Sequence, residues 1–300
     1  MLKRLLTTGS FLFICCFSNP GFGQLTLSED DRMELVAMED TLVGLADSMY
    51  NAFIPDQRPG YCEKFVKHLV RSLKIPNSWT YDFPKLKEVI NIIAPDDNAF
   101  RIFNWQIIPQ PNQVRYYGAV QLPAEELKLY PLIDYSHELT SGLEDSILTN
   151  TRWYGALYYR IHTHELEGNK IYTLFGLNAA GLVSNKKVLD PMRFTENGLV
   201  FGAPVFNYSS ESNPAVSVKR FVMEYKKDVS ASLNWDKDLN MIYFDRLASQ
   251  MNDPNRKYTF APTGQYDGFR LYQGKWTFVR DLIPIQNFKD GEAPAPKAFK

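Results

Sequence analysis

The chain has 300 residues, 45% of them hydrophobic and 22% charged, so it is long enough to bury a hydrophobic core of its own. Its 33 basic and 34 acidic residues nearly cancel, which leaves a formal net charge of −1. A chain without excess positive charge creates no field that attracts a phosphate backbone, so nucleic acid is excluded as an expected partner.

The first 23 residues have the pattern of an export signal. Residues 3–4 are basic, residues 5–17 form a short apolar run, and Gly21 and Gly23 are small residues spaced two apart. This order is typical of a secretory signal peptide. The run is shorter than the about 20 apolar residues that a membrane-spanning helix needs. We therefore predict cleavage after Gly23, export to the periplasm or the cell surface, and no transmembrane helix once the signal is removed.

The mature chain keeps one cysteine. Cys15 and Cys16 lie within the predicted signal, and Cys62 alone remains, so no internal disulfide can form. A nucleophilic role for Cys62 would need a nearby base to generate the thiolate. Because free cysteine is among the most buried residue types, we expect an inert, buried thiol instead.

Residues 24–95 are predicted to form a helical N-terminal region. Apolar residues recur at steps of three or four through residues 28–53, and Ser28 is a favourable N-cap residue. A second helix is expected over residues 61–73, where the same period continues. Residues 84–93 fit either a short third helix or a strand.

Residues 96–285 are predicted to form an antiparallel β domain. Short runs rich in aromatic and β-branched residues alternate there with turn signals such as Glu167–Gly168–Asn169. Connections this short leave no room for the crossovers that parallel strands need, so consecutive strands should pair in antiparallel fashion.

Two other turns carry specific expectations. Asn197–Gly198 is a strong hairpin signal, and we expect it to join strands at Lys187–Phe194 and Leu199–Phe206. Pro109 and Pro111 stand at the end of an earlier hairpin, where proline should prevent regular pairing because it has no N–H to donate.

These patterns predict an α+β, mostly β protein, in which the N-terminal helices pack on a large antiparallel β-meander. About ten to twelve strands rarely stay in one flat sheet, so they should close into a barrel or split into layered sheets. Residues 286–300 are small, polar and proline-bearing, and we expect a flexible tail there.

A weak internal echo links two segments of the predicted β domain. Tyr116–Val120 resembles Trp153–Leu157, and each segment has glycine at its third position. Glycine inside a strand often marks a bulge or a close approach of two backbones. The two segments would be equivalent strands if the domain had two related halves.

Several aromatic segments follow one another in a characteristic order. They are Phe100–Trp105, Trp153–Tyr159, Tyr172–Gly176, Asn185–Val188, Phe201–Phe206, Tyr266–Asp267 and Gly274–Trp276. In this order they resemble a family of exported proteins from Bacteroidetes-type bacteria, over most of residues 28–283. That family has no assigned activity, so the resemblance implies an exported setting and no reaction.

His162 and His164 are candidate metal ligands. Two residues apart on a strand, they point the same way, so both imidazoles can reach one metal ion. A zinc site needs three or four ligands, usually at least three of them from the protein, and the sequence does not identify the others. The alternative is an exposed hairpin end just before Glu167–Gly168.

Four tryptophans are candidates for a ligand-binding surface on which sugar rings would stack. The alternative is that these large side chains fill the core of the sheets or cover it. The four residues are Trp105, Trp153, Trp235 and Trp276.

No known catalytic or cofactor motif is present, and no cofactor is expected. The sequence contains no nucleophile elbow, phosphate-binding loop, dinucleotide fingerprint or zinc-protease motif. The leading hypothesis is an exported, non-catalytic interaction protein that binds an envelope protein or a glycan. One alternative is an exported hydrolase of glycans or peptides, which should have two carboxylates in one pocket. A second alternative is an outer-membrane β-barrel.

Overall fold

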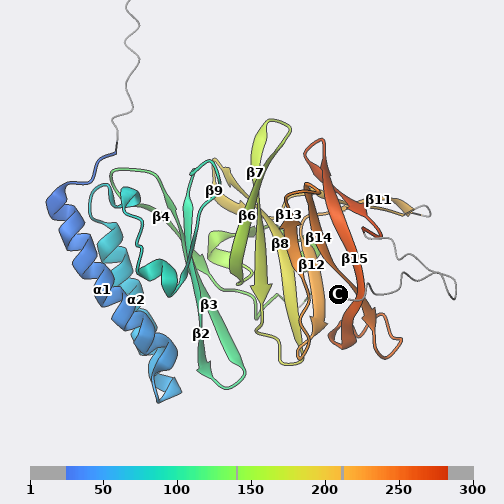
Figure 1. Cartoon of the computed structure of the whole chain (residues 1–300), viewed down its shortest axis with the longest axis horizontal. Coiled ribbons are helices and arrows are strands. Elements are labelled where there is room, and N and C mark those ends of the chain that lie inside the picture. The colour runs from blue at the N-terminus through green and yellow to red at the C-terminus, as the bar shows by residue number, and fades with distance from the viewer. Residues whose placement is uncertain (1–24, 140, 211–212, 283–300) are drawn as a thin grey trace, which may run out of the picture.

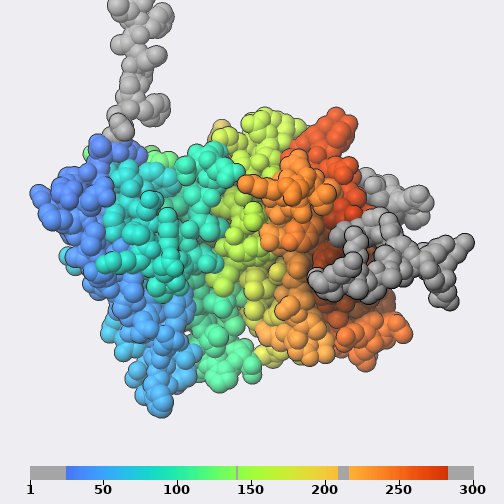
Figure 2. All heavy atoms as spheres, viewed as in Figure 1, coloured from blue at the N-terminus to red at the C-terminus, as the bar shows by residue number. Residues whose placement is uncertain are grey.

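The computed structural model describes residues 25–139, 141–210 and 213–282, and arranges them in four layers (Figure 1). One layer of helices is followed by three β-sheets, which we call the first, second and third sheet in order of distance from the helices. In the space-filling view the layers follow one another from the blue helices to the orange and red third sheet (Figure 2). The predicted signal peptide (1–23) and the whole of the predicted tail (286–300) lie outside the described residues.

The helical layer is a pair of packed helices with short 3-10 turns. Ser28 Oγ accepts a hydrogen bond from the N–H of Asp31 at 3.1 Å, which is the capping expected at this end. The second helix begins before residue 61, because Pro59 is favourable in a first turn. No described helix combines the length and the apolar character needed to cross a bilayer. The elements are α1 (Glu29–Asn51), η1 (Pro55–Gln57), α2 (Arg58–Leu73), η2 (Ser78–Thr80) and η3 (Leu86–Glu88).

The first sheet has the strand order β1-β2-β3-β4, and its pairs are antiparallel. Residues 84–93 contain η3 and then a strand, so both alternatives for this segment occur. The irregular pairing expected at Pro109 is present: the register of β2 and β3 shifts between Ile107 and Gln110, although β2 continues to Gln110. The strands are β1 (Asn91–Ile93), β2 (Arg101–Gln110), β3 (Gln113–Leu122) and β4 (Lys128–Ile133).

The second sheet has the order β5-β9-β8-β7-β6, and β12 also pairs with β8. The predicted turn at Glu167–Gly168 has positive φ at both residues, 52° and 76°, as a type I′ hairpin requires. The strands are β5 (Leu148–Thr149), β6 (Leu157–Leu166), β7 (Asn169–Asn178), β8 (Ser184–Thr195), β9 (Gly198–Phe201) and β12 (Phe221–Lys226). Short 3-10 turns are η4 (Leu143–Asp145), η5 (Asn150–Arg152) and η6 (Lys257–Thr259).

The third sheet has the order β11-β10-β16-β15-β14-β13. Here β10 and β16 run parallel, unlike the antiparallel pairs expected throughout. That expectation was based on short connections, and these two strands are not neighbours in sequence. The strand predicted over residues 199–206 is divided at Gly202, whose φ is 102°. The strands are β10 (Phe206–Ser210), β11 (Asn213–Val218), β13 (Leu233–Asp236), β14 (Met241–Ser249), β15 (Phe260–Tyr272) and β16 (Lys275–Val279).

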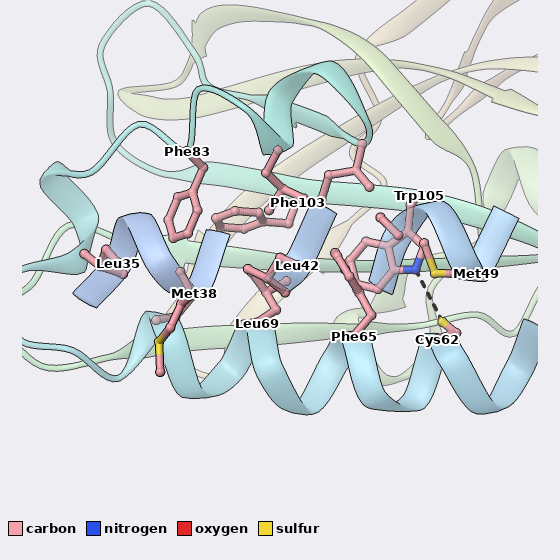
Figure 3. Packing of buried hydrophobic residues seen from close by; sticks show 14 of the residues in the cluster. Leu35, Met38, Leu42, Met49, Cys62, Phe65, Leu69, Phe83, Phe103 and Trp105 are labelled. Atoms are coloured by element: carbon pink, nitrogen blue, oxygen red, sulfur yellow. Dashed lines mark hydrogen bonds between the residues drawn. The ribbon is translucent and has the colours of Figure 1, made fainter. Parts of the chain in front are cut away.

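Three hydrophobic clusters lie between the four layers. The first joins the helices to the first sheet, where Leu42, Phe65 and Trp105 meet (Figure 3). The second lies between the first and second sheets and contains Trp153, and the third lies between the second and third sheets and contains Trp276. Of the two arrangements expected, the layered sheets are therefore the one present. Burial on both faces explains the nearly continuous buried runs in β2 and β7.

Strand β6 connects all three sheets. Asn104 of β2 accepts a hydrogen bond from the N–H of Tyr158 at 2.7 Å, which holds the first sheet to the second. The next residue, Tyr159, donates its hydroxyl to the carbonyl of Leu233 on β13 at 2.7 Å, which holds the second sheet to the third. These contacts fix the spacing of the layers around β6.

Candidate functional site

A pocket of about 810 Å³ opens between the first and second sheets. Its walls come from β3, β4, the segment after β4, the residue Tyr154 before β6, and the β7–β8 connection. Small-molecule sites are typically clefts of about 300–1,000 Å³ with a few convergent polar groups. The pocket has this size, and its polar groups are described next.

Two tyrosine hydroxyls lie in the pocket wall. Tyr116 accepts a hydrogen bond from the N–H of Ala179 at 2.6 Å, so its own proton remains available to a ligand. Tyr154 forms no hydrogen bond to another residue that the structure describes. Burial raises the pKa of both hydroxyls above the usual value of 10. Both therefore stay protonated and can act as hydrogen-bond donors at physiological pH.

Asp134 is held in the pocket by backbone groups. Its Oδ2 accepts a hydrogen bond from the N–H of Tyr116 at 3.0 Å, and its Oδ1 accepts one from the N–H of Ser136 at 2.9 Å. Gly155 makes room for this carboxylate, because a Cβ there would collide with Asp134 Oδ1. The φ of Gly155 is 73°, which also favours glycine.

Lys186 brings positive charge to the pocket. Arg115 is also a lining residue, but its side chain lies on the helix-facing side of β3, because Arg115 pairs with Ile107, which is buried against the helices. Lys186 Nζ lies 3.8 Å from Glu224 Oε2, and a third of the lysine side chain is exposed, so this ion pair is loose. Glu224 also accepts a hydrogen bond from Ser184 Oγ. The lining thus contains one lysine with a loosely held partner and a carboxylate that accepts hydrogen bonds from backbone N–H groups.

The hydrolase hypothesis requires two carboxylates in one pocket. Among the described residues, Asp134 is the only carboxylate that lines the pocket of 810 Å³. A smaller pocket of about 360 Å³ beside Tyr172 is lined by Glu196 as its one described carboxylate. This geometry supports ligand binding better than catalysis by a pair of carboxylates.

The structure places His162 and His164 on β6, facing the third sheet. Their ring centroids are 6.3 Å apart, and the ring of His162 lies 4.2 Å from Trp235. The ring of His164 lies 5.2 Å from Trp276, so the two histidines and two of the tryptophans meet in one cluster. Across the described ranges, no three His, Cys, Asp or Glu side chains are grouped to hold a metal ion. The pair therefore lacks the further protein ligands that a zinc site requires.

His164 is buried without a hydrogen-bond partner for either ring nitrogen. Burial, and secondarily the neighbouring His162, lowers the pKa of His164 to about 4. Burial also lowers the pKa of His162. Both imidazoles are therefore neutral at pH 7 and pack as aromatic rings.

The four tryptophans do not share a surface. Trp105 is 3% exposed in the cluster below the helices, while Trp153 and Trp276 are fully buried in two other clusters. Only Trp235 is half-buried, beside His162. The core-filling alternative therefore describes three of the four, and the structure does not bring them together as a sugar-stacking face.

Cys62 is buried, as expected. Trp105 donates its Nε1–H to Cys62 Sγ at 3.5 Å (Figure 3). Burial raises the pKa of the Cys62 thiol, which disfavours the reactive thiolate. The structure thus places this thiol within the core between the helices and the first sheet.

Sequence reasoning did not find the pocket. Tyr116 and Tyr154 both lie in the echo segments, which suggested related halves instead. These segments are not equivalent strands, because Tyr116 lies within β3 whereas residues 153–156 precede β6. The sequence did contain one signal for the pocket, which is a glycine close to a tyrosine in each segment. Glycine permits a close approach, such as the one that Asp134 makes to Gly155.

Comparison with known proteins identifies no relative: no family model matches the chain, and no curated protein or solved structure matches it either.

Proposed function

We propose that this chain is an exported, non-catalytic binding protein whose pocket between the first and second sheets takes a small polar ligand or the end of an envelope glycan. The observation that carries the proposal is the pocket of about 810 Å³ with two tyrosine hydroxyls available as donors. Donors without partners in a concave site favour a ligand rich in acceptor oxygens, as sugars are.

Binding to the pocket is tested with a panel of neutral and acidic saccharides, measured by titration calorimetry. Tyr154→Phe removes one oxygen and keeps the ring, so the fold should persist while the affinity falls about tenfold. Tyr272→Phe is the matched control, because Tyr272 is 65% exposed and lies outside the pocket lining. Wild-type protein that binds no saccharide, or a Tyr154→Phe variant that binds as tightly as wild type, would contradict the proposal.

Export is supported by the basic start at residues 3–4 and the short apolar run that follows it. The resemblance to exported proteins of Bacteroidetes-type bacteria points the same way. N-terminal sequencing of protein recovered from the periplasm or the cell surface should begin at Gln24. A product that keeps Met1 and stays in the cytosol would contradict this part of the proposal.

A further inference from the structure

We infer that His162 and His164 bind a soft monovalent cation, copper(I), between the second and third sheets. This site is separate from the pocket of the proposed function and does not depend on it. Both histidines lie on β6, and their rings contact Trp276 at centroid distances of 5.1 and 5.2 Å. Three features of the cluster support the site: unpaired ring nitrogens, the spacing of the imidazoles, and the aromatic rings around them.

The ring nitrogens of the two histidines are available to a metal ion. Both nitrogens of His164 are buried without a hydrogen-bond partner, and the residue is only 6% exposed. A buried polar group without a partner is costly and rare in native proteins. The ring of His162 forms no hydrogen bond to another residue that the structure describes. Each neutral imidazole therefore keeps a lone pair that can bind a metal ion.

The spacing of the two rings fits an ion with two ligands. Their centroids are 6.3 Å apart. With metal–nitrogen bonds of about 2 Å and allowance for the size of each ring, nitrogens on opposite sides of one ion place the centroids about 6 Å apart. The tetrahedral angle of a zinc site would bring them to about 5 Å and would require further ligands. Copper(I) accepts two ligands on opposite sides, and imidazole is a ligand that suits copper.

The surroundings of the two histidines favour a single positive charge. The rings of Trp235 and Trp276 lie 4.2 and 5.1 Å from His162, and the face of an indole attracts a cation. The charge of Asp96 also acts on His162, where it opposes the lowering of the pKa by burial. A divalent ion would bring a second charge into a site with little to compensate it, and burying a charge without compensation is expensive.

The cluster has one side that is closer to solvent. His162 and Trp235 are half-buried, whereas His164 and Trp276 are buried behind them. An ion can therefore enter beside His162 and reach His164 within the cluster.

Binding is measured with the purified, metal-free protein under anaerobic conditions, with ascorbate present and bicinchoninate as a competing chelator of copper(I). One equivalent of copper(I) should move from the chelator to the protein and change the tryptophan emission, because Trp235 and Trp276 lie at the site. X-ray absorption of the complex should show two nitrogen neighbours around copper. Zinc(II) at the same concentration should leave the tryptophan emission unchanged, because the site lacks the ligands that zinc requires.

Variants assign the binding to these residues. His162→Gln and His164→Gln should each lower the affinity for copper(I) about 100-fold, because each removes one of two ligands. Trp235→Leu removes a neighbouring ring but no ligand, and should lower the affinity about tenfold. His137→Gln and Cys62→Ser are the controls, because the His137 side chain is 72% exposed and Cys62 lies in the cluster below the helices. Thermal unfolding checks that each variant keeps its fold.

Each contrary outcome is distinct. A protein that takes no copper(I) from the chelator, or binding that survives His164→Gln, would overturn the site. If His164→Gln does not fold, His162→Gln at the half-buried position decides in the same way. Binding lost in Cys62→Ser but kept in His162→Gln would assign the ion to the thiol instead. Zinc(II) bound as tightly, or four neighbours around copper, would overturn the two-ligand assignment.

Discussion

At the scale of single residues, a buried ion pair lies at the centre of a hydrogen-bond network. Asp190 and Arg220 are fully buried, and Arg220 Nε donates to Asp190 Oδ1 at 2.8 Å. Tyr158 donates its hydroxyl to Asp190 Oδ2 at 3.0 Å, and Trp153 donates its ring N–H to that hydroxyl at 2.8 Å. This network lies between the first and second sheets, and each member depends on the others for its partners.

Removal of one charge from this network should be costly. We expect Arg220→Met to lower the free energy of unfolding by about 3–5 kcal/mol, because it leaves the Asp190 carboxylate buried and unpaired. Lys67→Met is the control, since the ion pair of Lys67 with Glu63 is exposed and should contribute little. Urea unfolding measures both variants, and equal small losses would show that the buried pair is not needed.

Gly155 should matter more than a glycine that has positive φ but open space around it. Gly155→Ala forces a strained backbone and displaces Asp134, so we expect a loss of about 1–3 kcal/mol from strain together with weaker ligand binding. Gly142→Ala is the matched control, because Gly142 has φ 67° but open space around it. Gly142→Ala should keep its ligand affinity, and equal affinities in the two variants would argue against the role of Asp134 in the pocket.

At the scale of elements, His164 on β6 should make the packing of the second sheet on the third sensitive to acid. His164 has a pKa of about 4 in the folded chain, below the 6.5 of an exposed imidazole. Between these values the unfolded chain binds more protons, so stability should fall as the pH drops from 6.5 to 4 and then level off for this group. The whole effect is about 3 kcal/mol at about 1.4 kcal/mol per pH unit.

Urea unfolding at pH 7 and pH 4.5 measures this effect. His164→Gln removes the titrating group, so the variant should lose much less stability over this interval than the wild type. His137→Gln should behave as the wild type, because the His137 side chain is 72% exposed. An unchanged acid dependence in His164→Gln would show that another group is responsible.

Element type followed from local patterns, whereas the partners of each strand did not. Ser28 and the apolar period predicted α1, and the Ser28 cap is present. The turn signal at Glu167–Gly168 predicted the hairpin of β6 and β7, and both residues have positive φ. The chain after Gly202 leaves the second sheet for the third, where β10 pairs with β16, a strand distant in sequence. Local propensity carries no information about such pairing, because the packing of whole layers determines it.

The whole molecule explains why the candidate site was only partly predictable. Aromatic residues are abundant because four layers need three hydrophobic clusters, so tryptophans that suggested a surface fill the interior instead. The pocket arises where two sheets separate, from segments far apart in sequence such as β3 and the β7–β8 connection. Sequence patterns identify the tyrosines as residues of strands or turns. They do not show that Tyr116 and Tyr154 meet in one pocket, because that depends on how two sheets pack.

The most direct test of the binding site is a crystal structure of the protein with the saccharide that binds most tightly. We predict that the sugar lies between the first and second sheets, within hydrogen-bond distance of Tyr154 Oη and close to Lys186. A sugar bound elsewhere, for example at the half-buried Trp235, with the pocket beside Tyr154 empty, would contradict the proposed function.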